Sequence, residues 1–215
     1  MRKIWLIPLL LILGACSILP KPAANVGVRY ALAPVVAAPV HSGVRCPLVL
    51  RVRSIEAAPP YAGDALVYTK TPLAVAEFAY HRWAAPPASM LTRDLVGALG
   101  ASGLYRGVLG PTDPGSADLT LAVHLTRGPV QVFPGLPGTT GKAPSSSTEV
   151  LSISAVLANA VNGKLIATHR FSGARRAQPD PYAGVVMANR LAGELIGRLT
   201  NWLAGINPTL DCRVR

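Results

Sequence analysis

The feature that most constrains the fold of this chain is a regular alternation of apolar side chains between residues 117 and 125. The apolar positions are Leu119, Leu121, Val123 and Leu125. Successive side chains of a strand point to opposite faces, so this period of two predicts a strand with one buried face. A sheet with one apolar face has to bury it against another layer of secondary structure.

Other segments have the composition and spacing of strands. They are residues 28–32, 47–55, 65–69, 73–80, 149–159 and 164–172, with a short extended segment at 104–109 and a continuation of the first strand at 130–133. The short connection Lys70-Thr71-Pro72 predicts a hairpin between two of them. Asn162-Gly163 favours the tight turn of a second hairpin, between 149–159 and 164–172. Arg175-Arg176 is expected to lie in a turn after the last strand.

Two segments show helical spacing. Pro87 suits a first helical turn, and a helix is predicted from about residue 88 to 101, with Leu91, Leu95 and Leu99 in one stripe. A second helix is predicted from Pro181 to about residue 204, with Asp180 as its N-cap and Gly205 at its end. Its apolar stripe is Val185, Ala188, Ala192, Leu195, Leu199 and Trp202.

The order of these elements is strands, helix, strands, helix. This order predicts a single α+β domain, in which a mostly antiparallel sheet has two helices packed on one face. No internal repeat or second domain is evident. Residues 134–148 are rich in Pro, Gly and Ser and predict a mobile loop, and the tail 206–215 is expected to lie on the surface.

Composition favours a folded domain. Half of the 215 residues are hydrophobic and 14% are charged, which is unlike a disordered chain. The net charge is +11, or +9 once Arg2 and Lys3 are removed. A basic surface favours anionic partners, although the charges are dispersed and a solvated surface of no specific purpose explains them equally well. Secretion, argued next, excludes nucleic acid as the partner.

Residues 1–16 have the layout of a secretory signal. A basic start, Arg2-Lys3, precedes an apolar run from Ile4 to Leu13 that is too short to cross a bilayer. Leu13-Gly14-Ala15-Cys16 resembles the bacterial lipobox, in which the cysteine thiol receives a diacylglyceryl group and becomes the new N-terminus. The sequence therefore predicts a signal peptide at 1–15, a lipidated tether at 16–27 that carries acyl chains such as palmitate on Cys16, and a domain at 28–215. Ser17, in place of Asp, resembles the pattern that enteric-type bacteria sort to the outer membrane, facing the periplasm.

Two cysteines remain once Cys16 is lipidated. Cys46 and Cys212 form an even pair in an oxidising compartment, and we expect a disulfide between them. Two unpaired thiols too far apart to join are the alternative.

No pattern of catalytic or metal-binding residues is present. His41, His81, His124 and His169 are scattered and lack the spacing of metal ligands. Zinc-protease, nucleotide-loop and nucleophile-elbow motifs are absent. We therefore expect a protein that is not an enzyme and has neither cofactor nor metal, although scattered serines leave an envelope hydrolase as a third hypothesis.

Aromatic residues are concentrated at 78–83, in a chain with few of them. Tyr80 and Trp83 are candidates for contact with a partner protein or an acyl chain. The alternative is structural: Phe78 and Tyr80 would fill the core between sheet and helices, and Trp83 would cover the following helix.

These pieces, in this order, resemble the ABC-type transport auxiliary lipoprotein family, which includes the paraquat-inducible protein C type. The resemblance extends from about Val28 to Leu203, and its most specific part is the Tyr-x-x-Trp-Ala-x-x-Pro segment from Tyr80 to Pro87. The matching pieces are Tyr30-Ala31-Leu32, Leu50-Arg51-Val52, Leu66-Val67-Tyr68, residues 78–87, Met90-Leu91, Ala101-Ser102-Gly103, Ala117-Asp118-Leu119-Thr120-Leu121 and Trp202-Leu203.

The resemblance implies a non-catalytic accessory role in the periplasm. Its members are outer-membrane lipoproteins that work with a mammalian-cell-entry substrate-binding protein and its permease and ATPase to move lipids between the two membranes. The alternative is a lipid-binding carrier that holds an acyl chain itself. Either hypothesis is compatible with a homo-oligomer. The segment 134–148 and the cysteine pair depart from a typical member, which leaves the particular partner open.

Overall fold

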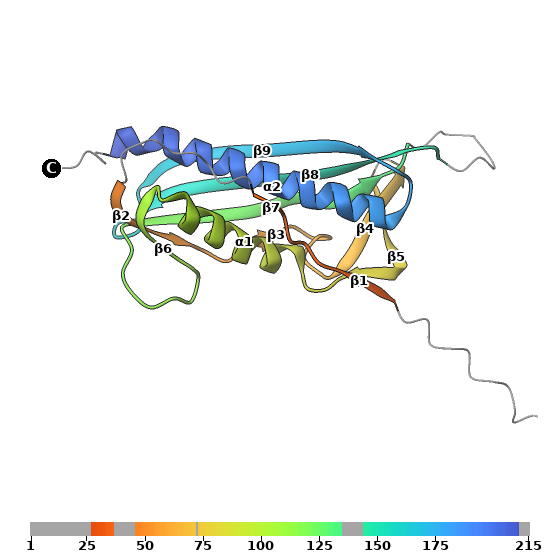
Figure 1. Ribbon diagram of the computed structural model, residues 1–215, viewed down its shortest axis with the longest axis horizontal. Coiled ribbons are helices and arrows are strands. Elements are labelled where there is room, and N and C mark those ends of the chain that lie inside the picture. The colour runs from red at the N-terminus through yellow and green to blue at the C-terminus, as the bar shows by residue number, and fades with distance from the viewer. Residues whose placement is uncertain (1–26, 37–45, 72, 135–143, 211–215) are drawn as a thin grey trace, which may run out of the picture.

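The computed structural model describes residues 27–36, 46–71, 73–134 and 144–210. In this described part the chain forms one sheet of nine strands and two long helices (Figure 1). The strands are β1 (Val28–Tyr30), β2 (Cys46–Val52), β3 (Glu56–Ala57), β4 (Ala65–Thr71), β5 (Ala74–Trp83), β6 (Tyr105–Leu109), β7 (Leu119–Val132), β8 (Ser147–Asn159) and β9 (Leu165–Ala177). The helices are α1 (Pro87–Ser102) and α2 (Pro181–Ile206), and the 3₁₀ helix η2 (Asn207–Leu210) follows α2.

The long strand β7 is the centre of the sheet. One edge of β7 pairs with β8 over nearly its whole length, and β8 in turn pairs with β9; both pairings are antiparallel. The other edge is divided among three short strands, β2, β3 and β4, which all run parallel to β7. The sheet therefore forks beyond β7: β6 continues the sheet from β2, whereas β5 and then β1 continue it from β4.

The predicted fold class is confirmed: this is a single α+β domain with a mostly antiparallel sheet and two helices. Both predicted hairpins, β4–β5 and β8–β9, are present and antiparallel. Asp180 caps α2 as expected, because its carboxylate accepts a hydrogen bond from the backbone N–H of Ala183 at 2.9 Å. The parallel pairings of β2, β3 and β4 were not predicted.

Two predicted boundaries are wrong. Arg175 and Arg176 lie inside β9 rather than in a turn, because their backbones pair with Glu149 and Thr148 of β8. Gly205 does not end α2, which continues to Ile206 and into η2. A single glycine in a helix costs only about 1 kcal/mol, and burial of the neighbouring Leu203 outweighs that cost.

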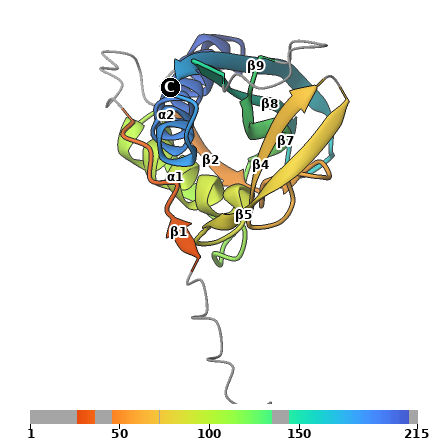
Figure 2. The same ribbon diagram turned by 90° about the vertical axis from the view of Figure 1, so that its right-hand side faces the viewer.

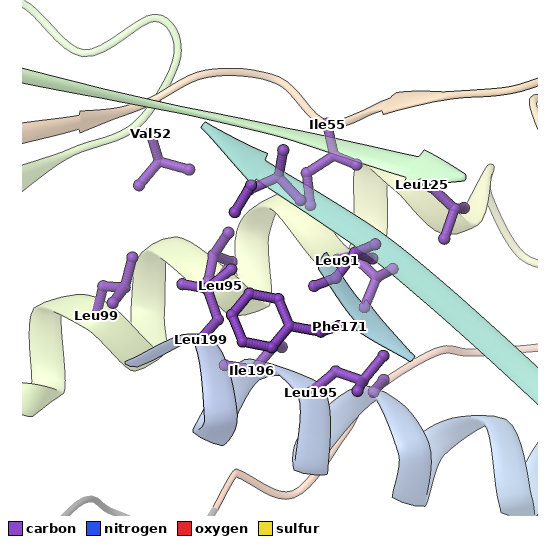
Figure 3. Packing of buried hydrophobic residues seen from close by; sticks show 14 of the residues in the cluster. Val52, Ile55, Leu91, Leu95, Leu99, Leu125, Phe171, Leu195, Ile196 and Leu199 are labelled. Carbon is purple, nitrogen blue, oxygen red and sulfur yellow. The ribbon is translucent and has the colours of Figure 1, made fainter. Parts of the chain in front are cut away.

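The core lies between the helices and one face of the sheet (Figure 3). Leu91 and Leu95 of α1 lie beside Phe171 of β9, and Leu195, Ile196 and Leu199 of α2 lie on the other side of this ring. On β7 the side chains of Leu119, Leu121, Val123 and Leu125 are all buried, as the alternation predicts. Burial of such side chains stabilises the domain by roughly 1.5–3 kcal/mol each.

The segment that follows β1 lies along α2. Asn189 of α2 holds it at two backbone positions, since its side chain accepts a hydrogen bond from the N–H of Ala33 at 2.7 Å and donates one to the carbonyl of Ala31 at 3.3 Å. One turn later, a Cβ on Gly193 would overlap the backbone oxygen of Val35. Residues 31–36 can approach the helix this closely only because position 193 has no side chain.

Substitution of Gly193 by Ala should therefore destabilise the domain. The added methyl group displaces residues 31–36 and weakens both Asn189 hydrogen bonds, at a cost of about 1–3 kcal/mol that exceeds the gain in helix propensity. Urea unfolding followed by circular dichroism measures the difference.

The matched control is Gly197→Ala, one turn further along the same helix. No heavy atom lies within 4 Å of the Cβ it would add, so this change should stabilise the domain by up to about 1 kcal/mol. Equal effects of the two substitutions would contradict this account of Gly193.

Candidate interaction surface

The structure places the predicted cysteines unequally. Cys16 and Cys212 lie outside the described residues. Cys46 is fully buried at the start of β2, and Leu210, two residues before Cys212, packs against the same core cluster. The disulfide stays a prediction, which the mass of the chain after alkylation in denaturant without reductant tests.

An irregularity in β5 separates the two predicted contact residues. Ala65 pairs with Arg82 and Val67 with Glu77, so β5 has three more residues than β4 between these two pairs. The extra residues shift the alternation of faces between Phe78 and His81. As a result Tyr80 is 56% exposed, whereas Trp83 is 2% exposed and belongs to the core. Of the two residues, only Tyr80 is available to a partner or a lipid, and it does not fill the core as the structural alternative assumed.

Aromatic rings form a connected row at the end of the molecule where β1 begins. Tyr30 of β1 is central: its ring stacks on His81 of β5 at 5.8 Å, and its hydroxyl lies 3.0 Å from His81 Nδ1. On one side Tyr30 contacts Tyr182 of α2 at 6.3 Å, and on the other side His81 contacts Phe78 at 6.1 Å. The row continues through Tyr68 of β4 and Phe133, which follows β7. Burial, with the charge of Asp180, raises the pKa of the Tyr30 hydroxyl, which therefore stays neutral at physiological pH.

Two open grooves lie on either side of the first turns of α2. The first, of about 480 Å³, is bounded by residues 29–35 and by Tyr182, Val186 and Arg190 of the helix. The second, of about 620 Å³, shares Tyr182 and Val186 and extends to Arg176 and Ser145. The stretch of helix between them has a mostly apolar outer surface with an arginine on each side.

A cluster of buried polar side chains lies between the first turns of α2 and strands β7 and β8. The Gln131 amide group donates hydrogen bonds to Ser147 Oγ at 2.8 Å and to the carbonyls of Gln178 and Asp180. These bonds fix the chain between β9 and α2 against the sheet. Gln131 Oε1 has no hydrogen-bond partner in the described structure.

Glu149 lies beside that unpaired oxygen. A Cβ on Gly184 would be 2.9 Å from Gln131 Oε1 and 3.3 Å from Glu149 Oε2, so both oxygens face the same point on α2. The side chain of Glu149 is 3% exposed, and burial raises its pKa well above the usual value. Burial therefore favours the neutral, protonated form of the Glu149 carboxyl at this position.

Stability should therefore depend on pH through Glu149. In the unfolded chain the carboxyl loses its proton above about pH 4.3, whereas the folded chain keeps it, so the free energy of unfolding falls as pH rises from there toward the raised pKa. Glu149→Gln removes this dependence. Between about pH 4.3 and the raised pKa, the difference in free energy of unfolding between variant and wild type should grow by up to about 1.4 kcal/mol per pH unit. Urea unfolding at several pH values measures this difference.

Glu194→Gln provides the control. Glu194 is exposed and pairs with Arg175 at 2.7 Å, and exposed ion pairs contribute about 0–1 kcal/mol. Its effect should not grow with pH in this way. If the Glu149→Gln difference is constant from pH 5 to 7, Glu149 is not protonated in the folded chain.

His124 and His169 have structural contacts, and His41 lies outside the described residues. His169 packs on Phe171 and Trp202, and His124 lies 3.6 Å from Glu56 at the exposed side of the sheet. In the described residues no three His, Cys, Asp or Glu side chains come together as metal ligands. No helix in the described part of the chain is long and apolar enough to span a membrane.

The fold and these surfaces define a small α+β domain with open grooves at one end. A family model described as the ABC-type transport auxiliary lipoprotein component matches residues 30–198, and the chain belongs to this family. The predicted resemblance is thereby confirmed.

Solved structures share the fold. The crystal structure of protein XCC0632 from Xanthomonas campestris is 19% identical, with a TM-score of 0.75, over 87% of this chain and all of that one. The crystal structure of an uncharacterized protein is 23% identical, with a TM-score of 0.51, over 75% of this chain and 94% of that one. No curated protein matches the chain.

Proposed function

We propose that this protein is a non-catalytic accessory component of a mammalian-cell-entry system that moves lipids between membranes, anchored at Cys16 in the outer membrane and facing the periplasm. The observation that carries the proposal is the family match, which extends from β1 into α2 and so includes nearly all of the described domain. ATP hydrolysis belongs to another subunit, since this sequence has no nucleotide-binding loop.

The tether supports the proposed geometry. Eleven residues lie between Cys16 and Val28, and a chain of that length spans at most about 40 Å when fully extended. Two or three acyl chains on Cys16 would hold the domain firmly, at roughly 0.8 kcal/mol per buried methylene. The domain would thus stay close to its bilayer, where it can receive the end of a periplasmic transport complex.

Affinity purification tests the partners. The tagged wild-type protein, solubilised from membranes in mild detergent, should co-purify the mammalian-cell-entry substrate-binding protein and its permease. The tagged Cys16→Ala variant serves as the matched control, because contact in the envelope should require the anchor. Recovery of neither partner with the wild type would overturn the proposal.

Cys16→Ala should also weaken the envelope barrier. Without the thiol no lipid is attached, and cells that carry this variant alone should be more sensitive to detergent than wild-type cells. Ser17→Ala is the control, because it leaves the thiol in place. A Cys16→Ala protein that still carries acyl mass, or that fully restores detergent resistance, would contradict the anchor.

A lipid carrier is the second candidate, and the groove of about 480 Å³ between residues 29–35 and α2 favours it. The side chains that line this groove are mainly apolar. Arg29 and Arg190 also line it, and their guanidinium groups could bind a lipid phosphate. Native mass spectrometry of the mature chain separates the two functions. Bound phospholipid beyond the Cys16 lipid supports a carrier, and its absence supports a docking role.

A further inference from the structure

Exposed apolar side chains are unevenly distributed over the molecule. In the described residues eight large hydrophobic side chains are exposed, and five of them lie at the end where the tether enters (Figure 2). We name these five the tether-end surface: Val28, Leu73, Val75, Tyr80 and Tyr182. They come from β1, the β4–β5 hairpin and the start of α2, which face the viewer together in Figure 2. Val161 and Leu165 lie at the opposite end, on the β8–β9 hairpin.

Leu73 is the most unusual member of this surface. Its side chain is fully exposed, and its backbone has φ 66°, a left-handed conformation that favours glycine or asparagine. Neither exposure nor backbone geometry gives a reason for leucine at the tip of this hairpin. A bulky apolar residue that costs stability at an exposed tip points to a contact outside the domain.

Cations and carboxylates both lie around the tether-end surface, and the exposed carboxylates are Glu77 of β5 and Asp180 before α2. Arg176 and Arg190 border the two grooves beside Tyr182, and neither forms a salt bridge with a carboxylate of the described residues. Lys70 lies beside the hairpin tip, with its ammonium group 5.4 Å from the ring centre of Tyr68. Apolar tips combined with unpaired cations match the headgroup region of a bilayer that contains anionic lipid.

The predicted tether indicates that the β1 end of the domain lies next to the bilayer that would hold the Cys16 lipid. Only eleven residues lie between Cys16 and Val28, so a lipid on Cys16 would hold the end of the domain that contains β1 near the bilayer. We propose that the tether-end surface rests on this bilayer, with Leu73 inserted among the headgroups and Arg176 and Arg190 paired with anionic lipid phosphates. This inference rests on the lipid anchor proposed above, but it requires no transport partner.

Fluorescence quenching by brominated lipids tests the contact. Mature protein purified from membranes, with its acyl mass confirmed, is placed in vesicles of phosphatidylethanolamine and phosphatidylglycerol at 7:3 with brominated acyl chains. The mature chain has two tryptophans, Trp83 in the core and the half-buried Trp202, which give the background. Leu73→Trp should add an emission that these lipids quench strongly.

Val161→Trp is the matched control. Position 161 is 87% exposed on the opposite hairpin, so its tryptophan should emit without quenching. Equal quenching at positions 73 and 161, or none at 73, would overturn the proposal, as would a mature chain without acyl mass. A tryptophan at position 73 that responds to an added substrate-binding protein and not to brominated lipid would assign this surface to a protein partner instead. A failed affinity purification would leave the vesicle result intact.

A second variant separates contact from stability. Leu73→Asn should raise the unfolding temperature, because asparagine adopts the left-handed backbone more readily. The same change should reduce the quenching of a Tyr182→Trp reporter, and Arg176→Gln with Arg190→Gln should reduce it more in these vesicles than in vesicles without phosphatidylglycerol. If Leu73→Asn lowers the unfolding temperature and leaves the quenching unchanged, Leu73 has a structural role and the proposal is wrong.

Discussion

The arrangement of the whole domain depends on the pairing of β7 along both of its edges. A buried strand has to satisfy the backbone groups on each side, and β8 does so continuously on one edge. On the other edge the same task is divided among β2, β3 and β4, each of which pairs with β7 over only two or three residues. Pairings so short are not stable alone, so β7 determines the positions of these strands. The position of β1 follows from β7 through β4 and β5.

Gly128 allows β7 to serve two separate branches of the sheet. Between Leu125 and Gln131 the strand has two more residues than the facing part of β8, which forms a bulge. Gly128 has φ 66°, and a Cβ there would overlap the carbonyl oxygen of Val150. Because two residues are added, the alternation of faces is preserved: Leu125 and Gln131 both point inward. The bulge therefore bends the strand toward β4 without exposing the core.

Local patterns in the sequence predicted most of the elements and few of the long-range pairings. The leucine spacing of α1, the Asp180 cap and the Asn162-Gly163 turn are properties of neighbouring residues, and the structure contains all three. Parallel pairing of β2, β3 and β4 with β7 joins segments far apart in the chain and has no local signature. The bulge in β5 is similar: it depends on pairing with β4 and β1, so regular alternation could not predict that Tyr80 is exposed while Trp83 is buried.

The residues of the candidate surface were harder to predict, because their burial or backbone conformation depends on the fold and not on their residue type. Glu149 is the third residue of β8, whose other inward positions are small or apolar, and only contact with α2 shows that it is buried. The sequence predicted Leu73 as the first residue of a strand, whereas in the structure it lies between β4 and β5 with a φ of 66°. In both cases the sequence has a residue that the local structure alone disfavours, and the reason lies in another element or outside the domain.

The contact of residues 31–36 with α2 gives the start of the domain a second attachment besides β1. β1 pairs with β5 over three residues only, which is a weak attachment for the first strand after a tether. Asn189 and Gly193 hold the next residues against α2, whose leucine stripe forms much of the core. Residues 31–36 are thus held by a helix that packs on the core, and not only by the edge of the sheet. The small residue at position 193 and the amide at position 189 are needed for this attachment as much as the apolar residues below them are needed for the core.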